Sequence, residues 1–283
     1  MYIKYSSSIV LDETTYPFVA FLIADKDNEF ICGGAIASAF FVLTTAECLI
    51  EKWSNSVELL SIYRYYVGAG DNTVAKDNPG NTQERRIELF IIHPDFTRKS
   101  EMHNIGLIKL RRPFDLGTRM ASAAMLPSYL CEGPDPIWEM YPTCILVDWG
   151  SEGISDSRPL RHRIVPLLNL SVCEAMHKNL DLALDENFHI CTRDPMLVEA
   201  SCSTDGGSLL LCGPRDRFRL HGLMHRRGSG CGPYPDPEIY TKILPYRPWL
   251  DETVEKVYKG SVQKFHQTRS ALNRGSRLCE MVE

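Results

Sequence analysis

The feature that most limits the possible folds of this chain is its set of ten cysteines, which are spread along its 283 residues. They are Cys32, Cys48, Cys131, Cys144, Cys173, Cys191, Cys202, Cys212, Cys231 and Cys279. None forms a CxxC pair with a matching CxxC or HxxxH partner, so disulfides explain them better than a zinc site does. Disulfides persist in oxidising compartments, and we therefore expect a secreted, extracellular protein.

The first residues support secretion less well. The short apolar stretch 16–24 follows Asp12 and Glu13 instead of a basic region, so no secretory signal is recognisable, which leaves open an incomplete or wrongly assigned N-terminus. No apolar run approaches the roughly 18 residues that a membrane-spanning helix needs. We therefore expect no membrane span.

The composition excludes some classes of function. A hydrophobic content of 44% with 24% charged residues is typical of a folded globular protein. The net charge of -5 and the pI near 5.9 argue against nucleic-acid binding, because phosphate backbones select for an excess of Lys and Arg. The histidines show no metal-like spacing, so we expect no metal and no cofactor.

Short apolar or alternating runs separated by Gly, Pro, Asn and Asp predict antiparallel strands in two β-units of similar size. The runs are 17–24, 30–37, 40–45, 63–67, 87–93 and 105–110, then 143–147, 160–166, 208–212, 217–224 and 239–243. Helices are expected at 171–179, where Ser171 can cap and Glu174 follows three residues later, and at 249–258.

Three ordered motifs then narrow the fold. CGGAI at 32–36 with FVLTTAEC at 41–48 resembles the CGGxLI and VLTAAHC strand pair of the trypsin family, with Glu47 in place of the histidine. NIGLIKL at 104–110 resembles DIALLKL, with Asn104 in place of the aspartate. CSTDGGSL at 202–209 resembles CQGDSGGP, with Gly206 in place of the nucleophilic serine.

The resemblance covers residues 16–250 and includes PEIYT at 237–241, which is similar to the family's PGVYT. It implies an all-β fold of two antiparallel six-stranded β-barrels with a C-terminal helix. Residues 1–15 would be a degenerate activation segment, because Ile9-Val10-Leu11-Asp12 only faintly resembles IVGG. Residues 251–283 would hold the end of the helix and a basic tail.

The family pattern also implies disulfide pairs. They are Cys32–Cys48, Cys144–Cys212, Cys173–Cys191 and Cys202–Cys231. The two remaining cysteines, Cys131 and Cys279, are expected to pair with each other. Alternatively, Cys131 bonds to a missing upstream segment and Cys279 stays free.

All three triad positions are therefore changed, and we expect no catalysis. Gly206 supplies no hydroxyl, Glu47 is a weak base for activating an alcohol near neutral pH, and Asn104 has no charge to support an imidazolium. The nearby Ser208 is interpreted as a structural serine in a turn.

The substrate apparatus is altered too. At the base of the specificity pocket Ala200 offers no charge, and His225-Arg226-Arg227 replaces the family's SWG in the wall of the cleft. Asp205, the residue that would pair with a freed N-terminus, is retained, and we interpret it as structural.

A local basic surface is expected from residues around one probable strand. They are Arg215, Arg217, Arg219, His221, Arg226 and Arg227. Such a surface suits a sulfated glycan, an anionic lipid surface or an acidic protein, although charge that protects an edge strand from pairing is an equally ordinary explanation. The sequon at Asn169 predicts possible glycosylation.

The sequence thus predicts a non-catalytic serine protease homologue that binds a protease, a zymogen, an inhibitor or a sulfated glycan, as a cofactor or regulator in an extracellular proteolytic cascade, including one of innate immunity. The alternative is a serine endopeptidase with residual or unconventional activity.

Overall fold

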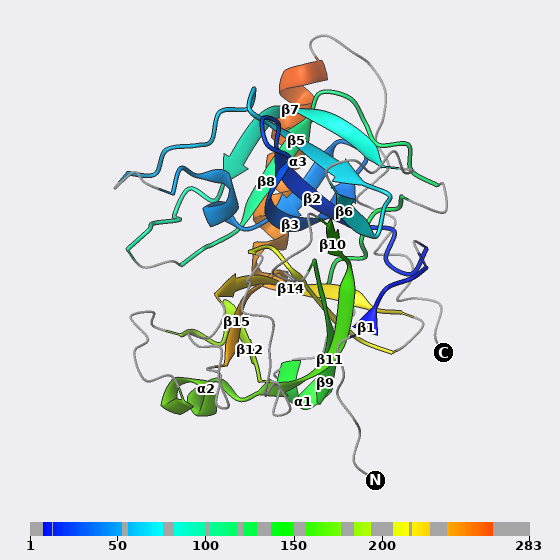
Figure 1. Cartoon of the computed structure of the whole chain (residues 1–283). Helices are drawn as coiled ribbons and strands as arrows, with labels where there is room; N and C mark the ends of the chain where they lie inside the picture. Colours follow the sequence, from blue (N-terminus) through cyan, green and yellow to red (C-terminus); the bar gives the residue numbers. More distant parts are fainter. Residues whose placement is uncertain are drawn as a thin grey trace, which may run out of the picture.

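The computed structural model describes residues 8–12, 14–52, 56–75, 82–99, 102–117, 121–128, 137–149, 157–176, 184–193, 206–214, 217–226 and 237–262. Two β-barrels lie one above the other, and helix α3 (Arg247–Val262) runs beside the upper, N-terminal barrel (Figure 1). The predicted fold, two closed six-stranded antiparallel barrels with a C-terminal helix, is confirmed.

The N-terminal barrel closes in the order β2-β3-β4-β8-β7-β5. Its strands are β2 (Val19–Ala24), β3 (Glu29–Ser38), β4 (Phe41–Thr44), β5 (Tyr65–Ala69), β7 (Gln83–Ile92) and β8 (Gly106–Leu110). Every strand expected in the first half overlaps one of these. Strands β2, β4 and β8 are buried along nearly their whole length, which explains why their sequences read as apolar runs.

The C-terminal barrel closes through the pairing of β9 with β11. Its strands are β9 (Thr143–Asp148), β11 (Arg161–Leu168), β12 (His189–Thr192), β13 (Leu209–Cys212), β14 (Arg219–Arg226) and β15 (Glu238–Lys242). A two-residue strand, β1 (Ser8–Ile9), adds to the outside of β11, and β6 (Thr73–Ala75) pairs with β10 (Ser157–Pro159) between the two halves of the chain.

The helices are short except for α3. They are α1 (Ile137–Met140), α2 (Leu170–Met176) and the 3-10 turns η1 (Ala46–Leu49) and η2 (Leu244–Tyr246). The cap expected from Ser171 is supplied instead by Asn169, whose Oδ1 accepts hydrogen bonds from the Ser171 N–H at 2.9 Å and from its hydroxyl at 2.7 Å. Residues 177–179 of the expected helix lie outside the described residues.

One apolar core joins the barrels and the C-terminal helix. The ring of Phe21, on β2, meets Trp149 edge-on with centroids 5.2 Å apart. At the other side, Tyr258 of α3 packs edge-on against Phe40 and Phe41, at 6.3 and 5.6 Å. Large aromatic contacts of this kind fix the position of each part relative to the others.

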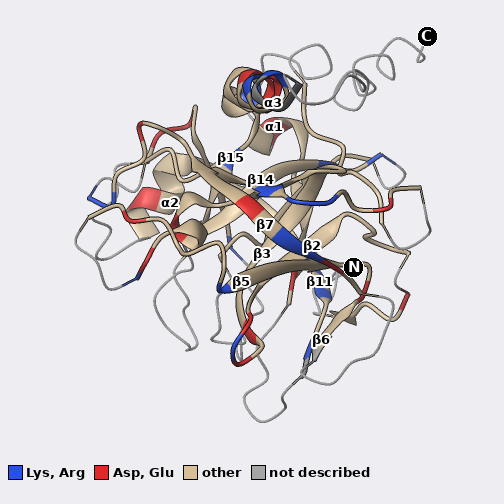
Figure 2. Ribbon diagram, turned by 90° about the horizontal axis from the view of Figure 1, so that it is seen from above, with Lys and Arg blue, Asp and Glu red and all other residues tan. Residues whose placement is uncertain are grey.

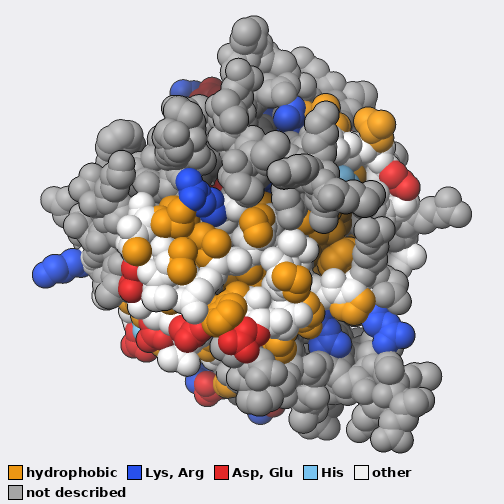
Figure 3. Space-filling model, turned by 90° about the horizontal axis from the view of Figure 1, so that it is seen from below, with side chains coloured by type: hydrophobic (Ala, Val, Ile, Leu, Met, Phe, Trp, Pro, Cys, Tyr) orange, Lys and Arg blue, Asp and Glu red, His pale blue; other side chains and the backbone are white. Residues whose placement is uncertain are grey.

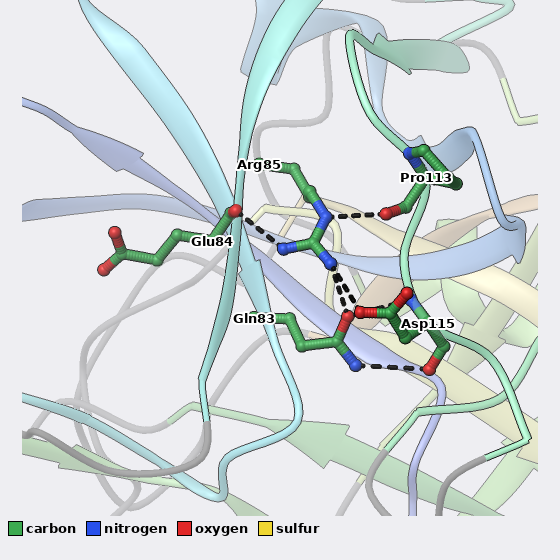
Figure 4. Close-up of polar contacts among 5 residues, drawn as sticks. All are labelled: Gln83, Glu84, Arg85, Pro113 and Asp115. Carbon is green, nitrogen blue, oxygen red and sulfur yellow. Dashed lines mark hydrogen bonds and ion pairs between the residues drawn. The ribbon is translucent and has the colours of Figure 1, made fainter.

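A polar clamp fastens the segment after β8 to β7 (Figure 4). Arg85 donates from Nε to the Pro113 carbonyl oxygen at 2.6 Å and from Nη2 to Gln83 Oε1 at 2.8 Å. The same guanidinium pairs with Asp115 at 3.1 Å, and its side chain is only 18% exposed. The planar guanidinium therefore satisfies three partners at once.

Charges of both signs share the surface. Figure 2 shows acidic and basic residues next to one another on β7 and α3. On the face seen from below, hydrophobic side chains are scattered among polar atoms and acidic side chains gather along one edge (Figure 3). No helix in the described residues is long and apolar enough to cross a membrane.

Candidate functional site

The three positions that correspond to the triad converge from three parts of the chain. Glu47 lies in η1 after β4, and Asn104 lies just before β8, which pairs with β4. The Glu47 N–H donates to Asn104 Oδ1 at 2.9 Å. A Cβ atom placed on Gly206 would lie 3.5 Å from Glu47 Oε1. The fold therefore assembles these residues in one site.

Asn104 lies at the boundary between the barrels. It is 1% exposed, and its carbonyl oxygen accepts a hydrogen bond from the Thr241 hydroxyl of β15 at 3.0 Å. Its Nδ2 is buried without a hydrogen-bond partner among the described residues. A carboxylate here would have only acceptors, so the amide leaves one buried donor unsatisfied that an aspartate would not carry.

The turn that would carry the nucleophile is held tightly by backbone bonds. Gly33 donates its N–H to the Gly206 carbonyl oxygen at 2.9 Å, and Gly207 donates to the Met224 carbonyl oxygen at 3.0 Å. Gly207 has φ +77°, and a Cβ there would lie 2.2 Å from the Gly33 oxygen. Only glycine fits such a position.

The neighbouring Gly206 has more room, since an added Cβ would meet Cys48 Sγ at 3.1 Å and Cys32 Sγ at 3.3 Å. These two sulfurs form a disulfide. Ser208, two residues after Gly206, is 2% exposed, and its carbonyl oxygen accepts a hydrogen bond from the Met224 N–H at 2.7 Å. The hydroxyl at 208 is thus carried by a buried residue.

Three disulfides lie within the described residues, and all are pairs that the family resemblance implied. They are Cys32–Cys48, Cys144–Cys212 and Cys173–Cys191. The expected pairs Cys202–Cys231 and Cys131–Cys279 lie outside the described residues, as do Ala200 and Asp205.

The expected basic surface is only partly present. Arg217 is exposed and Arg219 half-buried, whereas His221 is 1% exposed and its ring meets Tyr141 at 5.4 Å. Burial first, and then Arg219 and Lys242, lower the pKa of His221 to about 3.

Including His221 in an exposed basic surface was therefore wrong, because this side of β14 faces the protein interior. Arg215 and Arg227 lie outside the described residues, and of Arg226 only the backbone, at the end of β14, is described. His225, expected in the wall of the cleft, is itself 4% exposed.

The N-terminal segment lies on the outside of the C-terminal barrel. Ile9 pairs with Arg161 in β1 and is 49% exposed. Val10 is buried and donates its N–H to the Leu160 carbonyl oxygen at 2.8 Å. Ile9 is thus the last residue of an edge strand, and Val10 directly follows it. In this structure the two residues lie within the chain and do not form a free N-terminus inserted into the barrel.

A second contact fixes the same region. The Tyr16 hydroxyl lies 2.8 Å from His162 Nδ1, and burial raises the pKa of Tyr16 to about 12, so this hydroxyl stays protonated near neutral pH. The tyrosine therefore acts as a permanent hydrogen-bonding partner of the imidazole.

The sequence showed no metal-like spacing among the histidines, yet two pairs of them lie near this site. They are His93, His103, His189 and His225. No local pattern reveals them, because they come from both barrels; the only signal is that His103 directly precedes Asn104. Among the described residues no group of three His, Cys, Asp or Glu has an arrangement that could hold a metal ion.

Comparison with known proteins accounts for this geometry. The family model described as Trypsin matches residues 11–250. The chain is also 23% identical over 270 residues to the urokinase-type plasminogen activator of Gallus gallus, covering 92% of this chain and 59% of that protein. It spans about three fifths of the length of this curated relative. Because the family model covers most of its length, the chain belongs to the trypsin family.

Proposed function

We propose that this chain is a catalytically inactive member of the trypsin family that acts outside the cell by binding other macromolecules. The observation that carries the proposal is the meeting of Glu47, Asn104 and Gly206 in one site. Each of the three lacks the group that the family's chemistry needs at its position.

Acyl transfer by this fold needs a hydroxyl nucleophile, an imidazole that takes and returns its proton, and a carboxylate that orients the imidazole. Gly206 has no side chain to attack a carbonyl. A carboxylate such as that of Glu47 is a weaker base than an imidazole for activating an alcohol, and at neutral pH it is a poor acid for a leaving amine. Asn104 is neutral and has no charge to stabilise an imidazolium.

Loss of a serine or histidine alone costs on the order of 10⁶ in rate in subtilisin, where the triad acts as a unit. With all three groups replaced, we expect no catalysis beyond the small residual rate that substrate binding and an oxyanion hole can give without a triad. Ser208 does not replace the nucleophile, because it is buried and directly precedes β13.

The disulfides support an extracellular site of action. The relative's name, plasminogen activator, supports a role around proteolytic zymogens. We propose that the partner is a protease, its zymogen or a protease inhibitor, and that the chain serves as a cofactor or regulator in an extracellular cascade.

Peptide hydrolysis by the full chain, compared with that of the Glu47→His/Asn104→Asp/Gly206→Ser variant, tests the loss of catalysis. The unmodified chain should show no hydrolysis of a panel of peptide-ester substrates above that of a Glu47→His/Asn104→Asp control, which also lacks the nucleophile. Hydrolysis by the unmodified chain that a serine-directed inhibitor stops would overturn the proposal.

The binding role is tested separately, on immobilised chain with a purified trypsin-family zymogen and with heparin. A saturable interaction with the zymogen supports a protein partner. Retention on heparin that falls when Arg217 and Arg219 are both replaced by Ala would instead assign the role to a sulfated glycan. Absence of binding in both assays argues against a binding role.

A further inference from the structure

Four histidines from distant parts of the chain meet where the two barrels approach the start of α3. His93 follows β7 and His103 precedes β8, whereas His189 lies in β12 and His225 in β14. The rings of His93 and His103 stack, with centroids 4.9 Å apart and planes inclined by 16°. The centroids of His189 and His225 are 6.1 Å apart.

Aromatic side chains connect this cluster to the C-terminal helix. The Tyr246 hydroxyl lies 3.1 Å from His103 Nδ1, and the Trp249 ring centroid lies 5.0 Å from that of His93. Phe188, next to β12, meets the His103 ring edge-on at 5.2 Å and lies 5.8 Å from Tyr246. Trp249 in the first turn of α3 and Tyr246 in η2 therefore pack against the imidazole rings between β7 and β8, and Tyr246 also packs against Phe188 of the C-terminal barrel.

The backbone holds His103 in an unusual conformation. Its φ is +57°, a left-handed value that costs a non-glycine residue about 1 kcal/mol or more and persists only where the surroundings fix it. The Ile105 N–H donates to the His103 carbonyl oxygen at 2.7 Å. The stacking and the Tyr246 contact are thus the interactions that hold this side chain in place.

The surroundings disfavour positive charge on His189. Burial first, and then the neighbouring His225, lower its pKa to about 4, and His103 adds a smaller effect in the same direction. Asp185 opposes them with its negative charge, and its N–H donates to His189 Nδ1 at 3.0 Å. A proton at Nδ1 would break this hydrogen bond, because the nitrogen would then be a donor facing a donor.

At the other end of the cluster, the surroundings also disfavour positive charge on His93. Burial and then His103 lower the pKa of His93, and Asp95, 3.9 Å from its Nδ1 and largely exposed, opposes them only partly. Burial and then Asp185 raise the pKa of Tyr246, so its hydroxyl carries no negative charge that could offset an imidazolium. The N-terminal end of the α3 dipole, close to Trp249, is also positive.

We propose that His93, His103, His189 and His225 form an acid-sensitive junction that releases the start of α3 and strand β12 when the imidazoles are protonated. Neutral rings stack and pack, whereas two imidazolium ions about 5 Å apart repel each other in a partly buried site. The opening is reversible because it changes only protons and packing. The junction would act in the same way whether or not the chain has catalytic activity.

Hydrogen–deuterium exchange of the full chain at pH 7.5 and 5.0, corrected for the intrinsic pH dependence of exchange, tests the proposal. A folded pKa of about 4 for His189 against about 6.5 in an opened state favours opening about 30-fold at pH 5.0. Amides of 189–192 and 244–254 should therefore exchange about 30-fold faster at pH 5.0, through an opening of lower free energy than the unfolding of the whole chain that exposes the amides of β4 and β8.

A His103→Phe/His189→Phe variant keeps flat rings but removes one titrating imidazole from each pair, so its acid acceleration should fall markedly. His221→Gln is the matched control, because His221 is buried but lies outside the cluster, and its local acceleration should persist. Equal acceleration in all strands, no acceleration at pH 5.0, or unchanged acceleration in the double variant would each overturn the proposal.

If the double variant does not fold, a measurement on the unmodified chain still tests the proposed junction. Trp249 fluorescence, assigned by a Trp249→Phe variant, should change reversibly as the pH falls from 7.5 to 4, because protonation of His93 alters the ring against which the indole packs. Fluorescence that stays constant over this range would refute the junction.

Discussion

Two adjacent glycines in the candidate site have different physical roles. Gly207 adopts φ +77° and leaves no room for a side chain, so any other residue would push the turn away from β3. Gly206 is not among the described glycines with a left-handed φ. A Cβ atom added to it would make contacts of 3.1 Å or more. The proposed loss of the nucleophile thus requires only a different side chain at position 206.

We therefore predict that Gly206→Ser lowers the free energy of unfolding by about 1 kcal/mol or less, whereas Gly207→Ala lowers it by about 3 kcal/mol or more. Chemical denaturation of both variants measures the difference. Gly117→Ala is the control, since Gly117 also has a left-handed φ, +88°, but has nothing within 4 Å of an added Cβ. A Gly207→Ala loss no larger than that of Gly117→Ala would contradict the tight turn.

At the scale of elements, the clamp on β7 distinguishes a partly buried arginine from an exposed one beside it. Arg85 bonds a carbonyl, an amide and a carboxylate, whereas Arg86 pairs with Asp25 while its side chain is 57% exposed. Exposed ion pairs contribute little to stability, but a partly buried guanidinium with several hydrogen-bond partners contributes more.

Replacing Arg85 by Ala should lower the free energy of unfolding by about 2 kcal/mol, because the Pro113 carbonyl loses its side-chain donor and Gln83 Oε1 keeps only the Asp115 N–H. Arg86→Ala should cost about 0.5 kcal/mol or less. Urea denaturation gives both values, and similar losses in the two variants would show that the clamp contributes nothing beyond a surface charge.

The elements also show what a single sequence can reveal. Strands with sustained alternation, such as β3 and β7, were predicted to within a few residues. Strands β1, β6, β10 and β12 were missed, because each has only two to four residues and depends on a partner far away in the sequence. The cap of α2 was misplaced because Asn169 and Ser171 are both good capping residues, and only the structure shows which oxygen accepts.

For the whole molecule, the motifs predicted which positions correspond to the triad, and the structure brings those positions together. They could be predicted because Glu47, Asn104 and Gly206 each lie within an ordered motif. The histidine junction could not be predicted in this way, since His103 and His189 come close enough to interact only after two barrels have closed and packed. The burial of His221 was missed because residues 220–225 of β14 are all buried, on both faces of the strand, so alternation does not show which of them reach the surface.

Buried neutral histidines also set the acid stability of the whole chain. The pKa of His221 is lowered to about 3 in the fold and returns to about 6.5 on unfolding. The unfolded chain therefore binds the proton first, so the stability that depends on the neutral ring is complete above pH 6.5 and is lost as pH falls toward 3.

Between pH 7 and pH 5 this one residue should lower the free energy of unfolding by about 2 kcal/mol. In His221→Gln the difference in stability between the two pH values should shrink by that amount, whereas the contributions of carboxylates cancel between the two proteins. Guanidinium denaturation at both pH values checks this. An identical pH dependence would mean that His221 has the same pKa in the folded and unfolded protein.

The central claim is that this trypsin-family chain has no serine nucleophile. Its most direct test is intact-mass measurement of unreduced protein after incubation with a fluorophosphonate probe, alongside active trypsin as a positive control. The account predicts an unchanged mass for this chain and complete labelling of trypsin. A stoichiometric adduct on any serine, Ser208 included, would contradict the account and show that the chain retains an activated hydroxyl.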